Sequence, residues 1–385
     1  MTSSAKKIHL IAAARPNFMK VAPLYHALNR RRDRFEPILV HTGQHYDPNM
    51  SDAFFRDLEL PSPHHFLGIG SGSHAEQTAG VMIAYEKLCL AARPDMVVVV
   101  GDVNSTVAAA LVATKLHIPC AHLEAGLRSR DRRMPEEINR LVTDAISDLL
   151  WTPSADGDEN LLAEGVPPGK IECVGNIMID SYEMMRPKIT DDPGPTRLGL
   201  RSGEYAVVTL HRPSNVDGRE ALTELIHGLT SISARLALVF PVHPRTRKKL
   251  EEFGLWAELA GNPRIKPIEP LGYIAFMALV QNARCVITDS GGVQEETTYL
   301  GIPCLTLRDT TERPITVTHG SNRLVKLPGL SAAIDEVLAG RWSTGKRPHH
   351  WDGRAAERVA DAIARWFEPA KPDRATLQGI VRAAR

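Results

Sequence analysis

Two carboxylates stand at the ends of the most apolar runs in the first half of the chain. Asp102 follows the valine-rich run 95–100, and Glu124 follows the run 119–123. If these runs are adjacent parallel strands, their carboxyl ends lie at the same edge of a sheet, where α/β proteins bind ligands. Two like charges in a partly desolvated site raise the pKa of at least one carboxyl group, which suits general acid–base chemistry. Asp102 is explained equally well as the N-cap of a helix that begins near residue 104.

A third acidic position, Glu136, opens the predicted helix 136–150. Pro135 before it and Glu137 after it are both typical of a first helical turn, where the macrodipole favours acidic side chains. Helix-start chemistry therefore explains Glu136 without any catalytic role. Arg140 lies one turn later on the same face, and the i,i+4 spacing predicts that it orients Glu136.

Two cations follow the first predicted strand, residues 8–13. Arg15 is expected at the tip of this strand and Lys20 in the first turn of the helix 18–29. Cations beside a helix N-terminus favour a phosphate or diphosphate, although solvated surface charge gives the same pattern. This turn has no dinucleotide-binding glycine fingerprint, and the glycines of residues 68–73 are interpreted as a loop. Both observations argue against a classical dehydrogenase.

The second half carries another candidate anion site in the segment 288–296, TDSGGVQEE. Amides of Ser290, Gly291 and Gly292 are expected to hold a diphosphate at the start of a helix that begins at Val293. Glu296, one turn into that helix, is placed to accept hydrogen bonds from ribose hydroxyls.

Further residues of the second half extend this candidate site. Phe276 either stacks on a base or packs in the core, and Arg313 lies in the polar loop 307–314. His211, next to Arg212, and His243 each follow a predicted strand, which indicates an anion-facing rim. Zinc binding by the two histidines is disfavoured because no third ligand is indicated.

Apolar runs that alternate with helical patterns in both halves predict the fold class. Parallel strands buried on both faces give continuous apolar runs, so we expect an α/β protein with two Rossmann-like, doubly wound parallel sheets flanking a cleft. The domains are expected at residues 1–180 and 181–367, with the last helix packing on the N-terminal domain and a tail at 368–385. Residues 187–203 suit a linker, and a single helix is expected over residues 245–259.

Composition limits the partners that the chain can have. The sequence has 46 Lys and Arg against 45 Asp and Glu, so its charge indicates no nucleic-acid partner. The five cysteines are scattered without zinc-binding spacing, which predicts reduced thiols and no metal site. No apolar run approaches the roughly 20 residues of a membrane span. We therefore expect a cytoplasmic protein that does not contact a membrane.

Taken together, the motifs resemble a known family. ARPNFMK, GDVNST, HLEAGLRS, PEEINR, DSGGVQEE and RDTTERP occur in this order over about the first 325 residues and are similar to those of the non-hydrolysing UDP-N-acetylglucosamine 2-epimerases. The resemblance implies a GT-B fold, a homodimer, a UDP-sugar substrate, and no cofactor or catalytic metal. It also implies interconversion of UDP-GlcNAc and UDP-ManNAc by anti elimination of UDP and re-addition on the other face, supplying precursors for cell-surface polysaccharide.

The resemblance also implies roles for individual residues. The acid–base set is Asp102, Glu124 and Glu136, with His211 supporting the leaving UDP. The substrate-binding positions are Arg15, Lys20, Arg140, Phe276, Ser290, Gly291, Gly292, Glu296 and Arg313. A second, regulatory site would use Gln44, His45, Arg212 and His243.

Departures from the family pattern leave two alternatives open. Residues 46–48 differ from those of members that a second substrate molecule activates, so activation by substrate stays open. The changed region 68–74 favours a modified sugar, such as a 2,3-diacetamido uronate, as an alternative substrate. A hydrolysing relative that releases UDP and free ManNAc is the other alternative.

Overall fold

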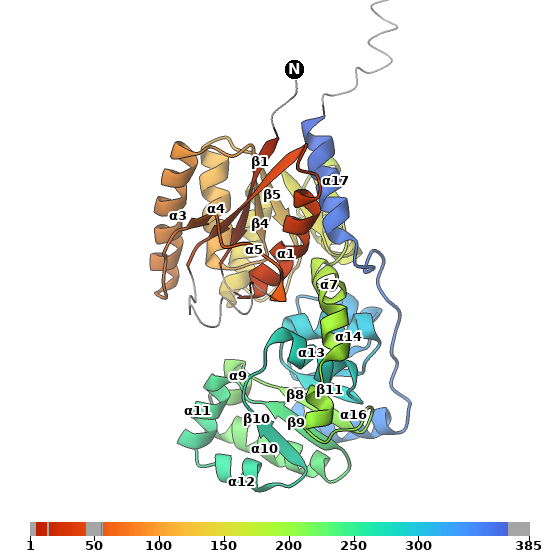
Figure 1. Cartoon of the computed structure of the whole chain (residues 1–385). Helices are drawn as coiled ribbons and strands as arrows, with labels where there is room; N and C mark the ends of the chain where they lie inside the picture. Colours follow the sequence, from red (N-terminus) through yellow and green to blue (C-terminus); the bar gives the residue numbers. More distant parts are fainter. Residues whose placement is uncertain (1–4, 14, 44–54, 56, 369–385) are drawn as a thin grey trace, which may run out of the picture.

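The computed structural model describes residues 5–13, 15–43, 55 and 57–368, and at residues 15 and 16 it describes the backbone alone. Strands and helices alternate along the chain and build two sheets, one in each lobe of the molecule (Figure 1). Every strand pair in both sheets is parallel. The predicted α/β class with two Rossmann-like sheets is confirmed.

The first sheet has the strand order β3-β2-β1-β4-β5-β6-β7. Its strands are β1 (Lys6–Ala12), β2 (Phe35–His41), β3 (His65–Phe66), β4 (Met96–Val100), β5 (Cys120–Leu123), β6 (Leu149–Thr152) and β7 (Ile171–Cys173). Its helices are α1 (Arg15–Asn29), α3 (His74–Ala91), α4 (Asn104–Lys115), α5 (Pro135–Ile146), α6 (Ala155–Ala163), the short η1 (Pro168–Lys170) and α7 (Ile177–Asp191). The strand order reverses between β1 and β4, and their carboxyl ends form the switch point where such sheets bind ligands.

Both faces of this sheet are covered, as the continuous apolar run in β4 requires. Met96, Val98 and Val100 pack in one hydrophobic cluster, whereas Val97 and Val99 pack in another on the opposite face. Each fully buried valine stabilises the fold by roughly 1.5–3 kcal/mol. The carboxyl end of β4 is therefore a rigid support for the residues that follow it.

The second sheet has the order β10-β9-β8-β11-β12-β13. Its strands are β8 (Tyr205–Thr209), β9 (Ala237–Pro241), β10 (Ile265–Ile268), β11 (Cys285–Thr288), β12 (Cys304–Thr306) and β13 (Asn322–Leu324). Its helices are α8 (Gly194–Arg197), α9 (Pro213–Val216), α10 (Arg219–Ser233), α11 (Pro244–Glu252), α12 (Trp256–Gly261), α13 (Tyr273–Gln281), α14 (Gly291–Leu300), α15 (Ile315–Thr318), the short η2 (Leu327–Gly329) and α16 (Leu330–Leu338). Its switch point lies between β8 and β11.

The prediction of one helix over residues 245–259 is wrong. The structure has two helices there, α11 and α12, separated by Gly254 with φ of 74°. This left-handed conformation is accessible to glycine and ends a right-handed helix. The apolar periodicity continued through the break, so the pattern alone did not reveal it.

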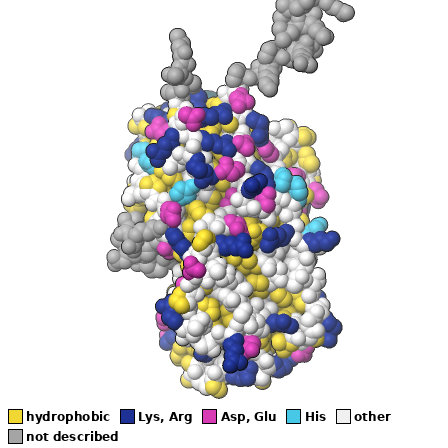
Figure 2. Space-filling view, turned by 45° about the vertical axis from the view of Figure 1, so that its right-hand side comes forward, with side chains coloured by type: hydrophobic (Ala, Val, Ile, Leu, Met, Phe, Trp, Pro, Cys, Tyr) yellow, Lys and Arg dark blue, Asp and Glu magenta, His cyan; other side chains and the backbone are white. Residues whose placement is uncertain are grey.

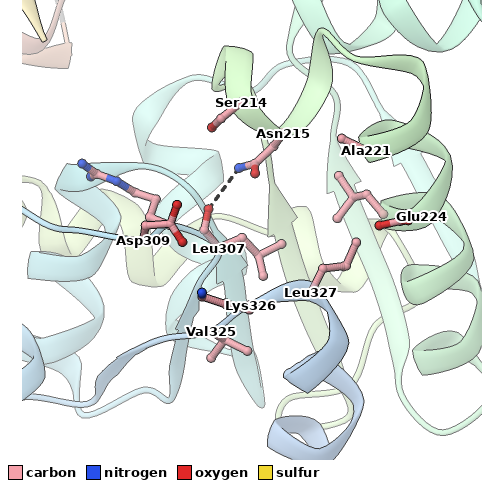
Figure 3. A pocket seen from close by; sticks show the side chains of 11 residues that line it. Ser214, Asn215, Ala221, Glu224, Leu307, Asp309, Val325, Lys326 and Leu327 are labelled. Atoms are coloured by element: carbon pink, nitrogen blue, oxygen red, sulfur yellow. Dashed lines mark hydrogen bonds between the residues drawn. The ribbon is translucent and has the colours of Figure 1, made fainter. Parts of the chain in front are cut away.

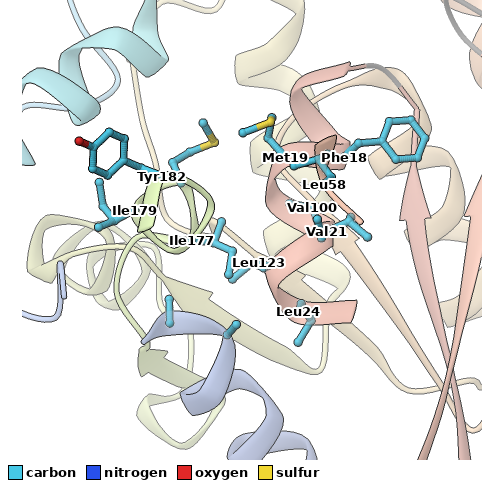
Figure 4. Close-up of a cluster of buried hydrophobic side chains, with 14 of the residues drawn as sticks. Phe18, Met19, Val21, Leu24, Leu58, Val100, Leu123, Ile177, Ile179 and Tyr182 are labelled. Carbon is cyan, nitrogen blue, oxygen red and sulfur yellow. The ribbon is translucent and has the colours of Figure 1, made fainter. Parts of the chain in front are cut away.

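The two lobes share a hydrophobic core through α7. One cluster of buried side chains contains Phe18 and Met19 of α1 and Ile177 and Tyr182 of α7 (Figure 4). The same cluster includes residues 277–280 of α13. The predicted domain boundary at residue 180 falls inside α7, and the division into the two domains stays a prediction. None of the helices in the described part of the chain is both long and apolar enough to cross a bilayer.

The last helix, α17 (Ala355–Phe367), lies beside α1 in the upper lobe, the one that contains the first sheet (Figure 1). The lower lobe contains the second sheet. Arg31, in the turn that follows α1, forms ion pairs with Glu357 and Asp361 of α17. Asp180 of α7 accepts hydrogen bonds from the amides of Ala355 (3.0 Å) and Ala356 (2.8 Å), which are among the unpaired donors of the first turn of α17. The chain therefore passes between the lobes a second time and is anchored where it returns.

We predict that Asp180→Ala destabilises the protein by roughly 1–3 kcal/mol, because two buried amide donors lose their acceptor. Hydrogen exchange should quicken at the first amides of α17, and the midpoint of thermal unfolding should fall. The matched control is Asp191→Ala, at the exposed end of the same helix. Equal unfolding midpoints for the two variants would contradict this role of Asp180.

Candidate active site

A cavity of about 290 Å³ lies between the two lobes, at the carboxyl ends of both sheets. Figure 2 shows Lys and Arg side chains in a row across the middle of the molecule, where the lobes meet. The cavity is lined by Lys20, Asp102, Met134, Glu136, Arg140, Met178, Arg212, Ser290, Gly291, Gly292, Glu295, Glu312 and Arg313. Nine of the site residues predicted from the sequence thus come together, from segments almost 300 positions apart.

Glu124, directly after β5, is held in a strained conformation beside Lys20. Its φ of 73° is left-handed, which is unusual for a residue other than glycine and typical of functional sites. Its Oε2 accepts a hydrogen bond from Lys20 Nζ, and both side chains are buried. A Cβ on Gly101 would lie 3.4 Å from each of these two atoms, so a side chain there would crowd the pair. Glu124 Oε1 is buried and has no hydrogen-bond partner among the described residues.

Asp102 pairs with an arginine and does not cap a helix. The residue at the N-cap of α4 is Val103, and no side chain caps that helix, so the N-cap interpretation of Asp102 is wrong. Asp102 Oδ2 accepts from Arg140 Nη1 at 2.5 Å, and its backbone carbonyl accepts from Asn139 Nδ2 at 2.9 Å. The carboxylate is 30% exposed, so it remains open to the cavity.

The prediction that Arg140 orients Glu136 is also wrong. Arg140 instead donates to the buried Glu137, from Nε at 3.0 Å and from Nη2 at 2.6 Å. Glu136 is exposed at the cavity wall and carries no ion pair in the described structure. Glu136 and Glu137 precede Arg140 by four and three residues, so both lie on the same helix face as Arg140. The buried carboxylate, that of Glu137, forms the stronger pair.

Lys20 lies in the second turn of α1, one turn later than expected, because the helix begins at Arg15. The side chain of Arg15 and the predicted regulatory residues Gln44 and His45 lie outside the described residues. Arg212 lines the cavity between the lobes, whereas His243 accepts a hydrogen bond from the amide of Arg245 at the start of α11. The separate regulatory site stays a prediction.

Asp289, directly after β11, organises the C-terminal wall of the cavity. It is fully buried and accepts from the backbone amides of His211 and Arg212 and from Asn215 Nδ2, all within 3.1 Å. His211 Nδ1 lies 3.0 Å from its Oδ1. Burial opposes ionisation of this carboxyl group, but the contacts with His211 outweigh burial and lower its pKa. The position of Asp289 directly after a predicted strand is the feature of the sequence that indicates such a role.

The start of α14 differs from the prediction in two details. The helix begins at Gly291, and the amide of Ser290 already donates to Thr288 Oγ1 at 2.9 Å, so Ser290 does not offer its amide to a ligand. A Cβ on Gly291 would lie 2.6 Å from Glu312 Oε1 and 2.8 Å from Arg313 Nη1. A Cβ at this position would therefore displace the ends of the Glu312 and Arg313 side chains from the start of the helix.

Arg313 carries the charge that faces both carboxylates of the upper lobe. It forms ion pairs with Glu295 (2.9 Å) and Glu312 (2.5 Å). Burial disfavours its charged form, but Glu295, Glu312, Glu124 and Asp102 together raise its pKa. A cation thus stays at the centre of the cavity at every physiological pH.

Glu296 is buried below this wall. Burial, with a further contribution from Glu295, raises its pKa to about 8, against the opposing effect of the nearby Tyr273 hydroxyl. Its Oε1 has no hydrogen-bond partner in the described part of the chain. Phe276 is half-buried and packs against the core, as the alternative to base stacking predicted.

A second cavity of similar volume lies in the lower lobe, beyond β12 and β13. Ser214, Asn215, Glu224, Asp309 and Lys326 surround it together with apolar side chains (Figure 3). None of the residues assigned above to the acid–base set lines it. Within residues 5–43 and 57–368, no three His, Cys, Asp or Glu side chains are grouped so that they could hold a metal ion.

Comparisons with known proteins agree with this architecture. A family model described as UDP-N-acetylglucosamine 2-epimerase matches residues 26–364. A UDP-N-acetylglucosamine 2-epimerase of Methanocaldococcus jannaschii is 44% identical over 92% of this chain and 97% of its own length. A UDP-2,3-diacetamido-2,3-dideoxy-D-glucuronate 2-epimerase of Pseudomonas aeruginosa is 40% identical over 93% and 99%.

A solved structure of the M. jannaschii enzyme, in complex with UDP-GlcNAc and UDP, superposes with a TM-score of 0.85. It is 42% identical and covers 93% of this chain and 99% of its own. The predicted GT-B-type fold is thereby confirmed. Since the family model matches most of the chain and both relatives align along nearly their full lengths, this chain belongs to the UDP-N-acetylglucosamine 2-epimerase family and is an epimerase.

Proposed function

We propose that the chain interconverts UDP-GlcNAc and UDP-ManNAc without releasing free sugar. The observation that carries the proposal is the cavity between the lobes. It brings two carboxylates that are paired with cations, Asp102 and Glu124, close to the N-terminus of α14 and Arg313. Inversion at C2 needs a base for the C2 proton and groups that stabilise a departing diphosphate. Both requirements are met by side chains that line or adjoin this one cavity.

In the first step, a carboxylate of the upper lobe takes the C2 proton. The C2–H electrons form the C1=C2 double bond, and the C1–O bond breaks with its electrons passing to UDP. In the second step, a carboxylic acid delivers a proton to the opposite face of C2, the electrons of the C1=C2 double bond form the new C2–H bond, and a UDP oxygen adds to C1. We assign Asp102, Glu124 and Glu136 to these proton transfers.

The lower lobe stabilises the leaving UDP in this proposal. Arg313, Arg212 and the first amides of α14 offer positive charge and hydrogen-bond donors where negative charge develops. Asp289 contacts Nδ1 of His211, so Nε2 is the ring nitrogen that faces a ligand. Lys20 and Arg140 hold Glu124 and Asp102 in place through their ion pairs.

The 40% identity to the diacetamido-uronate epimerase of P. aeruginosa supports a second substrate candidate. That sugar differs at C3 and C6 and undergoes the same chemistry at C2. We further propose a cytoplasmic homodimer that supplies polysaccharide precursors. The exposed apolar side chains Ile83 and Leu90 of α3 support association of this kind.

Solvent deuterium exchange at C2 tests the proposed reaction. We expect the protein to incorporate deuterium into UDP-GlcNAc and to form UDP-ManNAc, both followed by NMR. Accumulation of free UDP and ManNAc would identify a hydrolysing enzyme instead. Faster exchange into the 2,3-diacetamido uronate would identify that sugar as the substrate.

Replacing the paired carboxylates tests the site. Asp102→Asn and Glu124→Gln should each slow C2 exchange by about 100-fold or more, because each removes a proton-transfer group. UDP binding, measured by calorimetry, should survive in both variants. The exposed Glu86→Gln is the charge-matched control. Wild-type exchange in either site variant would refute the assignment.

The raised pKa of Glu296 predicts a pH-dependent affinity for UDP. If its carboxylate accepts from the ribose hydroxyls, the complex favours the ionised form that burial disfavours in the free protein. Binding then releases a proton, and affinity falls as the pH drops below about 8, by up to about tenfold per pH unit. Calorimetry in buffers of different ionisation enthalpy measures this proton, and Glu296→Gln should abolish the release. The same proton release in Glu296→Gln would assign it to another group.

A further inference from the structure

Glu137 is a buried carboxylate that the proposed reaction does not use. Its Oε2 accepts from the amide of Ser129 at 2.9 Å and from Ser129 Oγ at 3.1 Å, and its Oε1 accepts from the amide of Arg130 at 2.8 Å. Its side chain is only 2% exposed. It therefore cannot meet a substrate, yet it lies next to Glu136, which lines the cavity.

The other partner of Glu137 is Arg140. Nε and Nη2 of Arg140 both donate to Glu137 Oε2, a forked contact that fixes the plane of the guanidinium. The remaining terminal nitrogen, Nη1, donates to Asp102 Oδ2 at 2.5 Å. Arg140 is itself 2% exposed, so its orientation is set by these two carboxylates.

The charges alternate in sign along the series Glu137, Arg140 and Asp102. Burial raises the pKa of Glu137, but the amide of Ser129 and the contacts with Arg140 outweigh it, and its pKa is lowered. Glu137 is thus an anion that shares the positive charge of Arg140 with Asp102. A guanidinium paired with one carboxylate alone would stabilise the ionised form of that carboxylate more strongly.

We propose that Glu137 is a positioning residue for catalysis: it fixes the guanidinium of Arg140 against Asp102 and divides the positive charge of Arg140 between the two carboxylates. The inference rests on the proposed function, because it concerns the same carboxylate. It extends that function by assigning the efficiency of Asp102 to a side chain that never touches the substrate. Among the described residues, the contacts that link Glu137 to Asp102 run through the guanidinium of Arg140.

Glu137→Gln tests the inference because it keeps the shape of the side chain and removes its charge. We expect kcat for C2 exchange to fall by roughly 10- to 100-fold, since the guanidinium is no longer fixed. UDP affinity should remain unchanged. The acidic limb of the pH profile of kcat/KM should move to lower pH, because the undivided charge of Arg140 makes Asp102 harder to protonate.

Glu137→Asp separates charge from position. It retains the negative charge on a shorter side chain, so kcat should fall while the acidic limb keeps its wild-type position. If Glu137→Gln does not fold, this variant alone decides, and a wild-type kcat in it would overturn the inference. Asp148→Asn is the matched control, since Asp148 also accepts a backbone amide, that of Cys120, but at the opposite end of β5. We expect wild-type kcat and an unshifted profile in this control.

The outcomes distinguish the two proposals. Absence of C2 exchange in the wild-type protein would reject the proposed function. Exchange in the wild type together with the same kcat and acidic limb in Glu137→Gln would reject the role of Glu137 alone. A loss of kcat in Glu137→Gln with an unshifted acidic limb would show a merely structural role and would also reject it.

Discussion

Charge compensation in the cleft between the lobes is the constraint on which the structure depends. The cavity wall contains more ionised groups than an apolar environment tolerates, and each buried one is paired, Glu124 with Lys20 and Arg313 with Glu295 and Glu312. Removing one member of such a pair leaves an uncompensated charge, at a cost of about 3–5 kcal/mol. The segments that supply the partners must therefore meet, and the parallel sheets bring them to the same edge.

The connections between the lobes keep this arrangement together. Asn176, the N-cap of α7, accepts from the amide of Met178 and donates to Glu295 of α14 at 2.9 Å. The ionic network of the lower lobe is thus tied to the helix that both lobes pack against. The return of α17 to α1 adds a second attachment. The two walls of the cavity are thus connected by α7 and by the return of the chain to α17.

The sequence predicts well where the strands end, but it predicts poorly which groups the side chains pair with. The runs before Asp102 and Glu124 predicted adjacent strands because a parallel sheet buries both faces, and this physical cause leaves a clear pattern. The partner of Arg140 left no comparable pattern. Glu136 and Glu137 are both within one turn of it, and burial, which the local sequence does not encode, decided between them. Likewise, the hydrogen bond that occupies the amide of Ser290 depends on the rotamer of Thr288.

The residues that the sequence did not single out have a common position. Glu137 and Asp289 are both buried, and each accepts two backbone amides while it contacts a basic side chain, Arg140 in the upper lobe and His211 in the lower. Groups preoriented in this way need little reorganisation when charge develops on a ligand. A side chain that faces the cavity is recognisable by its type, whereas the carboxylate behind it resembles an ordinary helix-start or strand-end residue. The inner carboxylates are therefore where the structure adds most to what the motifs indicate.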